Sequence, residues 1–441
     1  MLVKLELLRL LIEMALSYVL PVAKRLVLGS FSGVISGALT IDGPNDESIT
    51  LGKRSLATPA PRIEVLDEFF WLRVLLFGDI GFSESYMLHE ISTTELTAVL
   101  EFFIHNSSAV NTTTTLGLVT SLFGNLFRRT NNDITTSHLN AAAHYSISNE
   151  MFTAFLSPDM TYSAPIWLPL SNPLSKTETL EEAQLSKLQY AIGQTRIRGT
   201  DHVLEIGTGW GSFAIVAARM TGCRVTTVTP SGEQKRLAEE RIRSSGMDDR
   251  IEVVQADYRE LGGLGTFDKI VSIEMIEHVG HDFLDAYFEC VDRYLKHDGG
   301  IGYFQCITIP ETRYERYRRS EDFIKKYIFP GGHLPTVSGL VASINRGSKG
   351  KLIVEEILSV GKHYSKALRC WNEKLQENFE TRIIPALKKG NPEMTTDEMK
   401  VFRKKWEYYF CYCEAGFNTK ALGDVAITVG RQNCMALLEE A

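Results

Sequence analysis

The sequence of 441 residues contains no long uncharged apolar run, no paired cysteine motif and no long basic segment. Residues 2–27 are rich in leucine, but charged side chains interrupt them before they reach the length of a membrane-spanning helix. Glu13 lies inside what would be the apolar core of a signal peptide, so a secretion signal is not expected. The seven cysteines include no C-x-x-C pair, which indicates reduced thiols in a cytoplasmic protein. The net charge of -7 argues against nucleic acid as a partner.

The chain is longer than one sheet domain needs, so we expect two domains. Residues 1–104 are predicted to form a small α+β domain, with a hairpin around residues 42–46. Residues 105–137 are rich in Asn, Thr and Ser and are predicted to form a linker. Residues 138–441 then make up the larger, catalytic domain.

Apolar residues in the first segment recur at steps of three and four, which predicts an amphipathic helix. The stripe consists of Leu5, Leu8, Ile12, Ala15, Val19 and Val22. Such a helix either packs on its own domain or lies on a membrane surface, peripheral to the bilayer. The sequence leaves both alternatives open.

The most informative motif is a buried strand that runs into a glycine turn, at residues 203–211, followed by a helix from residue 212. Further strands are expected at residues 224–229, 251–257 and 268–274, separated by helical stretches. This alternation predicts an α/β fold with a doubly wound, mostly parallel sheet of Rossmann-like type. Ligands of such folds bind at the carboxyl ends of the strands.

The spacing of the glycines helps to distinguish which class of ligand binds at this turn. The turn reads G-x-G-x-G, and its third glycine comes one residue earlier than in the dinucleotide-binding fingerprint. The tighter turn suits the S-adenosylmethionine site of class I methyltransferases, which has no pyrophosphate to hold. Asp257 and Tyr258, after the third predicted strand, form an acid and aromatic pair that can contact an adenine. The alternative is a glycine turn that binds nothing.

Further motifs follow one another in a fixed order, at residues 144–150, 159–163, 180–184, 229–234, 272–280, 327–332 and 408–417. In order and spacing they resemble the cyclopropane-fatty-acyl-phospholipid synthase family, which includes the mycolic acid cyclopropane synthases. The resemblance covers roughly residues 138–430, and residues 78–87 also look like the N-terminal domain of the longer members. It implies that the N-terminal domain assists lipid engagement and dimerisation, and hence a homodimer.

The resemblance also implies roles for individual residues. Those expected to bind S-adenosylmethionine are Tyr162, Ser163, Val203, Glu205, Gly207, Thr208, Gly209, Trp210, Gly211, Thr229, Gln234, Tyr258 and Arg259. Those expected at the catalytic centre are Glu277, Gln305, Ile307, Tyr409 and Cys413. Glu277, Ile307 and Tyr409 match residues that hold a bicarbonate ion. For Cys413 we favour packing over a nucleophilic role, because nothing nearby in the sequence lowers its pKa. No metal site is expected.

The implied reaction adds a methylene across a cis double bond of an unsaturated phospholipid acyl chain. Methyl transfer leaves a carbocation, and a base then removes a proton to close the cyclopropane. Two residues depart from the best-studied members, since Ala164 stands in place of Cys and Gln305 in place of His. A Gln amide can donate to bicarbonate but cannot change charge as His can.

Three other outcomes remain open from the sequence. Without bicarbonate, the cation would lose a neighbouring proton and leave a methyl-branched or methylene product. The acceptor could also be another apolar small molecule, an amine or a sphingolipid. A lipid-binding protein with a degenerate site is the third. The lipid reading predicts transient contact with a membrane surface.

Overall fold

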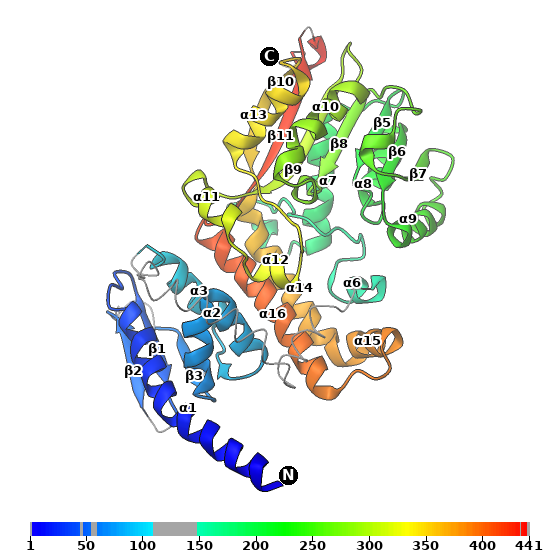
Figure 1. Cartoon of the computed structure of the whole chain (residues 1–441). Coiled ribbons are helices and arrows are strands. Elements are labelled where there is room, and N and C mark those ends of the chain that lie inside the picture. Colours follow the sequence, from blue (N-terminus) through cyan, green and yellow to red (C-terminus); the bar gives the residue numbers. More distant parts are fainter. Residues whose placement is uncertain (1, 45–46, 54–59, 109–147, 433, 439–441) are drawn as a thin grey trace. The chain divides into compact units, whose positions relative to one another are not determined.

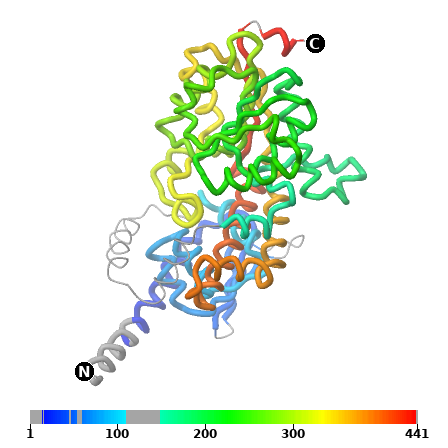
Figure 2. The backbone as a smooth tube through the Cα atoms, turned by 90° about the vertical axis from the view of Figure 1, so that its right-hand side faces the viewer, coloured from blue at the N-terminus to red at the C-terminus, as the bar shows by residue number. Residues whose placement is uncertain are grey.

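The computed structural model describes residues 2–44, 47–53, 60–108, 148–432 and 434–438. Its contacts divide the chain into two compact units (Figures 1 and 2). The N-terminal unit consists of Met1–Ser146, Glu321–Pro330 and Asn391–Thr419, and the sheet unit consists of Ile147–Ser320, Gly331–Gly390 and Lys420–Ala441. The predicted linker falls mostly on residues outside the described part.

Two segments that the sequence placed in the catalytic domain are grouped with the N-terminal residues. The long helix α16 (Thr396–Asn418) packs against α2 (Phe69–Met87) and α3 (Leu96–His105), as Figure 1 shows. The Tyr408 ring on α16 lies 5.9 Å from the Tyr86 ring and 4.6 Å from the Phe323 ring. Aromatic burial, rather than position along the chain, thus decides where α16 belongs.

The N-terminal unit also contains a small sheet in the order β2-β1-β3-β4. Its strands are β1 (Ala38–Asp42), β2 (Ser48–Gly52), β3 (Arg62–Val65) and β4 (Ile91–Ser92), and the short α12 (Phe323–Tyr327) belongs to the same unit. The antiparallel pairing of β1 with β2 confirms the predicted hairpin.

Helix α1 (Leu2–Ser30) confirms the helix predicted at the start of the chain. Ala23 and Val27 are its buried apolar residues in the described part, whereas Val19 and Val22 of the predicted stripe are 43% and 56% exposed. The side chains of Leu5, Leu8, Ile12 and Ala15 lie outside the described part. None of the described helices is long and apolar enough to span a bilayer.

Helix α2 is kinked by its glycines. Gly78 has a φ of 56°, a left-handed conformation that breaks the helical geometry and suits glycine. A Cβ at Gly81 would collide with the backbone carbonyl of Arg73, so the chain after the kink passes directly against the preceding turn. Both glycines lie in the 78–87 motif, and the structure gives them a packing reason.

The sheet unit is built on seven strands in the order β10-β11-β9-β8-β5-β6-β7. In chain order they are β5 (His202–Ile206), β6 (Arg224–Thr229), β7 (Ile251–Gln255), β8 (Lys269–Ile273), β9 (Ile301–Thr308), β10 (Leu352–Ser359) and β11 (Gly423–Arg431). Strands β5 to β9 pair in parallel, and β11 runs antiparallel to both of its neighbours. The four predicted strands and the predicted fold class are confirmed.

Helices cover both faces of this sheet, so the unit has three layers (Figure 1). One face packs against α7 (Leu180–Thr195), α8 (Ser212–Thr221) and α9 (Gly232–Ser244) through one apolar core. The other packs against α10 (Leu284–Tyr294) and α13 (Val337–Ser348) through a second core. The unit's remaining α-helices in the described part are α6 (Asn149–Phe155), α11 (Glu311–Arg319), α14 (Tyr364–Asn378) and α15 (Ile384–Gly390).

Candidate active site

The glycine turn after β5 has the backbone conformation that its sequence predicts. Gly207, Gly209 and Gly211 have φ values of 102°, 50° and 85°, all in the region that favours glycine. A Cβ at Gly211 would lie 3.5 Å from the Cβ of Ala238, so this glycine lets α8 approach α9. A Cβ at Gly209 would meet nothing within 4 Å. The turn therefore leaves a bare backbone edge at the carboxyl end of the sheet, where a ligand can approach.

The residues around this turn differ in exposure. Val203 on β5 is fully buried in the core that the sheet forms with α7, α8 and α9. Glu205 is 5% exposed, and burial raises the pKa of its carboxyl to about 8. Its Oε2 atom has no hydrogen-bond partner in the described part of the chain. The Thr208 hydroxyl accepts a 2.8 Å hydrogen bond from Thr227. A buried acceptor without a partner beside a bare turn fits a ligand that brings a cationic donor.

Helix α7 fastens the Tyr162–Ser163 segment. Gln184 donates a 2.8 Å hydrogen bond to the Ser163 carbonyl, and Lys187 donates one of 2.7 Å to the Ser163 hydroxyl. The Tyr162 ring lies 5.3 Å from Phe152 and 5.1 Å from Trp371. The predicted pair is thus held by two buried polar side chains and an aromatic cluster.

Trp210, within the glycine turn, is anchored to the residues that precede this segment. Its indole N–H donates a 2.9 Å hydrogen bond to Asn149. Arg241 on α9 donates to the Trp210 carbonyl and, at 2.7 Å, to the Asp159 carbonyl. Ser212 donates to the same Asp159 carbonyl. The turn and the 159–163 segment therefore form one hydrogen-bonded assembly.

The ends of β6 and β7 carry the other residues predicted to bind the cofactor. The Thr229 hydroxyl donates a 2.7 Å hydrogen bond to the Gln234 side chain. The Tyr258 ring lies 5.2 Å from Tyr287. Arg259 is bound to Asp257 at 2.7 Å, which fixes both charged groups beside Tyr258. These side chains share the strand-end edge with the glycine turn, and their contact with a cofactor stays a prediction.

Glu277 is buried at the end of β8, on the short helix η3 (Ile276–His278). Its Oε1 accepts a 2.6 Å hydrogen bond from the Ile307 amide, and its Oε2 has no partner in the described part. Burial, followed by the charge of Glu274, raises the pKa of Glu277 to about 8. His278, beside it, is exposed.

Gln305, fully buried on β9, joins two more carboxyl groups. Its amide nitrogen donates to Glu274 at 2.9 Å and to Asp424 at 3.0 Å. Glu274 also accepts a 2.7 Å hydrogen bond from the Ala164 amide and one of 2.6 Å from the Tyr364 hydroxyl. Burial, followed by the charges of the two glutamates, raises the pKa of Asp424 far above its usual range. Glu274, Glu277 and Asp424 are called the carboxyl cluster below.

The carboxyl cluster is close to the glycine turn. A Cβ at Gly207 would lie 3.1 Å from the Cβ of Met275, which is the residue between Glu274 and η3. Lys187, fully buried on α7, lies in the field of the same carboxyls. Burial lowers the pKa of Lys187 to about 8, while Glu274, Asp159, Asp424 and Glu205 oppose that shift. In the described part, no group of His, Cys, Asp and Glu side chains could hold a metal ion.

The structure does not assemble all of the predicted catalytic residues in one unit. Glu277, Gln305 and Ile307 lie together in the sheet unit, whereas Tyr409 and Cys413 lie on α16 in the N-terminal unit. The Tyr409 ring lies 5.5 Å from Trp406. Burial raises the pKa of the Cys413 thiol, which disfavours the thiolate and agrees with a packing role. A catalytic role for Tyr409 stays a prediction.

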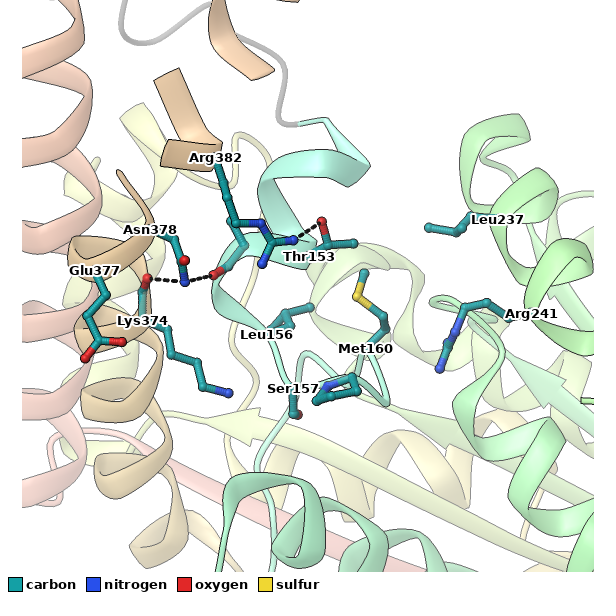
Figure 3. Close-up of a pocket in the computed structure, with 12 residues that line it drawn as sticks. Thr153, Leu156, Ser157, Met160, Leu237, Arg241, Lys374, Glu377, Asn378 and Arg382 are labelled. Atoms are coloured by element: carbon teal, nitrogen blue, oxygen red, sulfur yellow. Dashed lines mark hydrogen bonds between the residues drawn. The ribbon is translucent and has the colours of Figure 1, made fainter. Parts of the chain in front are cut away.

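The sheet unit also has a cavity of about 500 Å³ between α6, α9 and α14 (Figure 3). Met160 and Arg241 line this cavity, and Arg241 is the residue that binds the Trp210 carbonyl of the glycine turn. Lys374 and Arg382 contribute positive charge to its wall. The lining includes neither the glycines of the turn nor the carboxyl cluster.

Comparison with known proteins identifies the family. The model of the family described as mycolic acid cyclopropane synthetase matches residues 132–426. The chain belongs to this family. Tuberculostearic acid methyltransferase from Mycobacterium tuberculosis is 34% identical over 350 residues, which are 79% of this chain and 78% of that protein. Cyclopropane-fatty-acyl-phospholipid synthase from Escherichia coli K12 is 30% identical over 377 residues, which are 84% of this chain and 88% of the relative.

A solved structure agrees with this membership of the cyclopropane synthetase family. It is a mycolic acid cyclopropane synthase in complex with SAH and CTAB, with a TM-score of 0.54 and 26% identity. The match covers 66% of this chain and 97% of that one. The chain is therefore an enzyme of the methyltransferase class, in a family of S-adenosylmethionine-dependent lipid methyltransferases and cyclopropane synthases.

Three residues of this site were not predicted from the sequence, although the sequence contains an indication of each. Glu274 lies inside the 272–280 motif, in which only Glu277 was predicted to be catalytic. Asp424 is followed on β11 by the apolar residues Val425, Ala426 and Ile427, among which a carboxylate stands out. Lys187 shares a helix face with Ala183 and Ala191, where a buried lysine needs carboxylate partners.

Proposed function

We propose that this enzyme transfers a methyl group from S-adenosylmethionine to a cis double bond of an unsaturated phospholipid acyl chain, and then closes a cyclopropane. The observation that carries the proposal is a buried carboxyl cluster beside a bare glycine turn. An alkene is a weak nucleophile, so the donor has to be held in line with it. The resulting carbocation then requires a base in a site that excludes water.

The residues around the glycine turn fit S-adenosylmethionine. Gly207 and Gly209 present backbone without side chains, and the unpartnered Oε2 of Glu205 can accept from the amino group of the methionine portion. Thr229 and Tyr258 supply polar and aromatic contacts at the neighbouring strand ends. The bound cofactor supplies an electrophilic methyl group on a sulfonium.

The chain's own residues perform the remaining steps. Glu277 has a buried oxygen without a partner in the described part, and its raised pKa makes its ionised form a stronger base than an ordinary glutamate. The aromatic cluster of Tyr162, Phe152 and Trp371 excludes water and offers ring faces to a cation. A cation over an aromatic face gains about 2 kcal/mol when it is desolvated.

A second product is favoured by one observation. Gln305 occupies the position of the family's histidine and cannot take up a proton. The 34% identical relative is named a methyltransferase rather than a cyclopropane synthase. Loss of a proton from a neighbouring carbon would then leave a methyl-branched alkene. The methyl transfer step is common to both products.

The N-terminal helix supports a lipid substrate drawn from a membrane surface. On α1, Tyr18, Val22 and Leu26 are 75%, 56% and 40% exposed at steps of four residues. Ala23 and Val27 are buried at other positions around the helix. An apolar stripe on an exposed helix can insert into the interfacial region of a bilayer.

The deciding experiment is product analysis. The full-length protein is incubated with S-adenosylmethionine carrying a trideuterated methyl group and with vesicles of cis-unsaturated phospholipid. Cyclopropanation leaves two of the three deuterium atoms in a product without an alkene. A methyl-branched alkene keeps all three. Absence of label in the lipid, with S-adenosylmethionine bound, would contradict the proposed function.

A matched pair of variants tests the membrane contact. Val22→Glu on the exposed stripe of α1 should reduce turnover on vesicles but not on detergent-dispersed lipid, because it adds a charge where the helix meets the bilayer. Ser17→Glu, at an exposed position about 140° around the helix from Val22, controls for one added negative charge on another face of α1. An equal loss in both assays would argue against a membrane role for this face.

A further inference from the structure

The backbone and side-chain donors at the base site are already bound to carboxyl groups of the chain itself. The Ala164 amide, the Gln305 amide nitrogen and the Tyr364 hydroxyl all donate to Glu274, at 2.7, 2.9 and 2.6 Å. The Ile307 amide donates to Glu277 at 2.6 Å. Residues 305 and 307 are those at which the family resemblance implied a bicarbonate site. Here they hold carboxylates that are part of the protein.

The charge of the cluster also disfavours a bound anion. Three carboxyl groups lie together. The charges of Glu274 and Asp424 both favour the protonated form of the nearby Lys187. Burial raises the pKa of Glu274, and the pKa of Asp424 is raised further by the charges of both glutamates. An added bicarbonate would bring another negative charge into a buried site that already resists ionisation. The residues present therefore do not fit bicarbonate.

The backbone at Glu274 indicates that its position is specific. Glu274 has a φ of 49°, a left-handed backbone conformation that residues other than glycine rarely adopt. Such a residue persists where surrounding contacts hold it. At Glu274 those contacts are the three donors to its carboxylate, together with its own amide, which donates to the Gln305 carbonyl at 2.8 Å. The strain and the hydrogen bonds together aim one carboxylate at the base site.

We propose that Glu274 is a resident anion that takes the place of bicarbonate, and that Glu277 is the base which it activates. This inference rests on the proposed function and names the base within it. In the ring-closing step, a C–H bond of the added methyl breaks and its electron pair forms the new C–C bond. The proton passes to the unpartnered Oε2 of Glu277 and leaves to solvent after product release. Glu274 is a positioning residue, which acts on Glu277 through its charge.

The division of roles follows from the hydrogen bonds. Three donors to one carboxylate stabilise its ionised form, so Glu274 is the member of the cluster best suited to stay charged. Glu277 accepts from the Ile307 amide and adjoins the weakly donating Cys306 thiol, and its Oε2 has no hydrogen-bond partner in the described part of the chain. The groups whose charges couple to Glu277 are Glu274 at the end of β8, Cys306 on β9, Asp424 on β11 and Tyr287 on α10.

The first test is dependence on bicarbonate. The wild-type enzyme should turn over equally in buffer depleted of carbon dioxide and in buffer supplemented with bicarbonate. Glu274→Gly removes the carboxylate and relieves the left-handed backbone. Its turnover should fall about a hundredfold, the scale of general base catalysis, and added bicarbonate should restore most of it. Glu240→Gln, a surface carboxyl on α9, should behave as wild type. Loss of wild-type turnover on depletion would overturn the proposal.

The second test needs no lipid. Bicarbonate should raise the thermal midpoint of Glu274→Gly but not that of wild type, because only the variant has vacant donors. A bicarbonate-dependent rise in the wild-type midpoint would overturn the inference. This result is independent of whether lipid is the substrate. Failure of the enzyme to label any lipid would count against the proposed function and leave this measurement decisive.

Glu274→Gln keeps the size of the side chain and guards against misfolding of the glycine variant. Without the neighbouring negative charge, Glu277 ionises at lower pH, so the limb of the pH–rate profile that reports its ionisation should move to lower pH. A purely structural role for Glu274 would lower turnover without moving this limb. An unmoved limb would therefore overturn the proposal.

Discussion

At the scale of single residues, the site is defined by ionisable side chains that are buried, although their charged forms are more stable in water. Glu205 and Glu277 have pKa values raised to about 8, and Lys187 has one lowered to about 8. Such groups cost stability and are retained where chemistry requires them. Their cost gives the protein a specific dependence on pH.

Glu205 and Glu277 should each contribute a stability that falls as pH rises from 5 to 8, whereas His363, whose pKa burial lowers to about 4, opposes that fall up to about pH 6.5. A carboxyl whose pKa is higher in the folded state than in the unfolded state keeps its proton longer when folded. Its contribution is complete below its unfolded pKa, of about 4.3, and is lost as pH rises through its folded pKa. Both Glu205 and Glu277 act in this direction. Lys187 acts in the opposite direction, and only above about pH 8.

Glu277→Gln should flatten this fall, because the amide carries no proton to lose and its oxygen can still accept from Ile307. The variant should be more stable than wild type at pH 8 and inactive in ring closure. Urea unfolding at pH 5, 6, 7 and 8 measures the slope. Glu240→Gln, a half-exposed surface carboxyl, should leave the slope unchanged. Parallel slopes for wild type and Glu277→Gln would contradict a raised pKa at this position.

At the scale of elements, periodicity and glycine spacing predicted the strands of the sheet well. Residues 224–229 were predicted as a strand and form β6 without any change of bounds. The last five residues of β6 are buried Val and Thr, and such β-branched side chains favour strands, which the sequence displays directly. The same holds for the glycine turn, because its φ values permit few residues other than glycine.

The partners of elements were harder to predict. Helix α16 was expected in the catalytic domain because its motif, at residues 408–417, belongs to the series over which the family resemblance extends. Its buried aromatics instead pack on α2 and α3. An amphipathic helix shows which of its faces is buried but does not show against what. The carboxyl cluster was missed for a similar reason, since Glu274, Gln305 and Asp424 come from three strand ends that only the fold brings together.

The kink of α2 leads to a prediction at this scale. Gly81→Ala should destabilise the N-terminal unit, because its Cβ would collide with backbone rather than with a flexible side chain. We expect a loss of about 1–3 kcal/mol, typical of overpacking. Gly193→Ala on α7, where a Cβ meets nothing within 4 Å, should be neutral or stabilising by up to about 1 kcal/mol. Chemical denaturation measures both, and equal effects would argue against the close approach at Gly81.

At the scale of the whole molecule, neither compact unit is built from one continuous segment. The chain leaves the sheet unit for residues 321–330 and again for residues 391–419. Within the N-terminal unit, Glu84 ties residues 321–330 to the first hundred residues, because it accepts hydrogen bonds from Lys326 at 2.6 Å and Tyr327 at 2.8 Å. Residues 391–419 are tied to the same helix by Lys404, which donates a 3.0 Å hydrogen bond to the Tyr86 hydroxyl. The N-terminal unit therefore depends on residues from three distant parts of the sequence.

The cooperativity of this unit can be tested at Tyr408, whose ring contacts Phe82, Tyr86 and Phe323 from two other segments. Tyr408→Ala should cost about 3–5 kcal/mol, as for other large buried side chains. If the three segments open as one unit, amide hydrogen exchange should quicken together in residues 69–105, 321–330 and 391–419.

Tyr287→Ala is the matched control in the sheet unit, where the Tyr287 ring packs 5.1 Å from Phe288 and 6.2 Å from Phe304. It should quicken exchange around β8, β9 and α10 and leave residues 69–105 unchanged. Faster exchange on α16 alone in the Tyr408 variant would mean that the three segments do not fold cooperatively. Exchange that spreads through both units in either variant would mean that the whole chain opens in one step, and the division into two units would then carry no energetic weight.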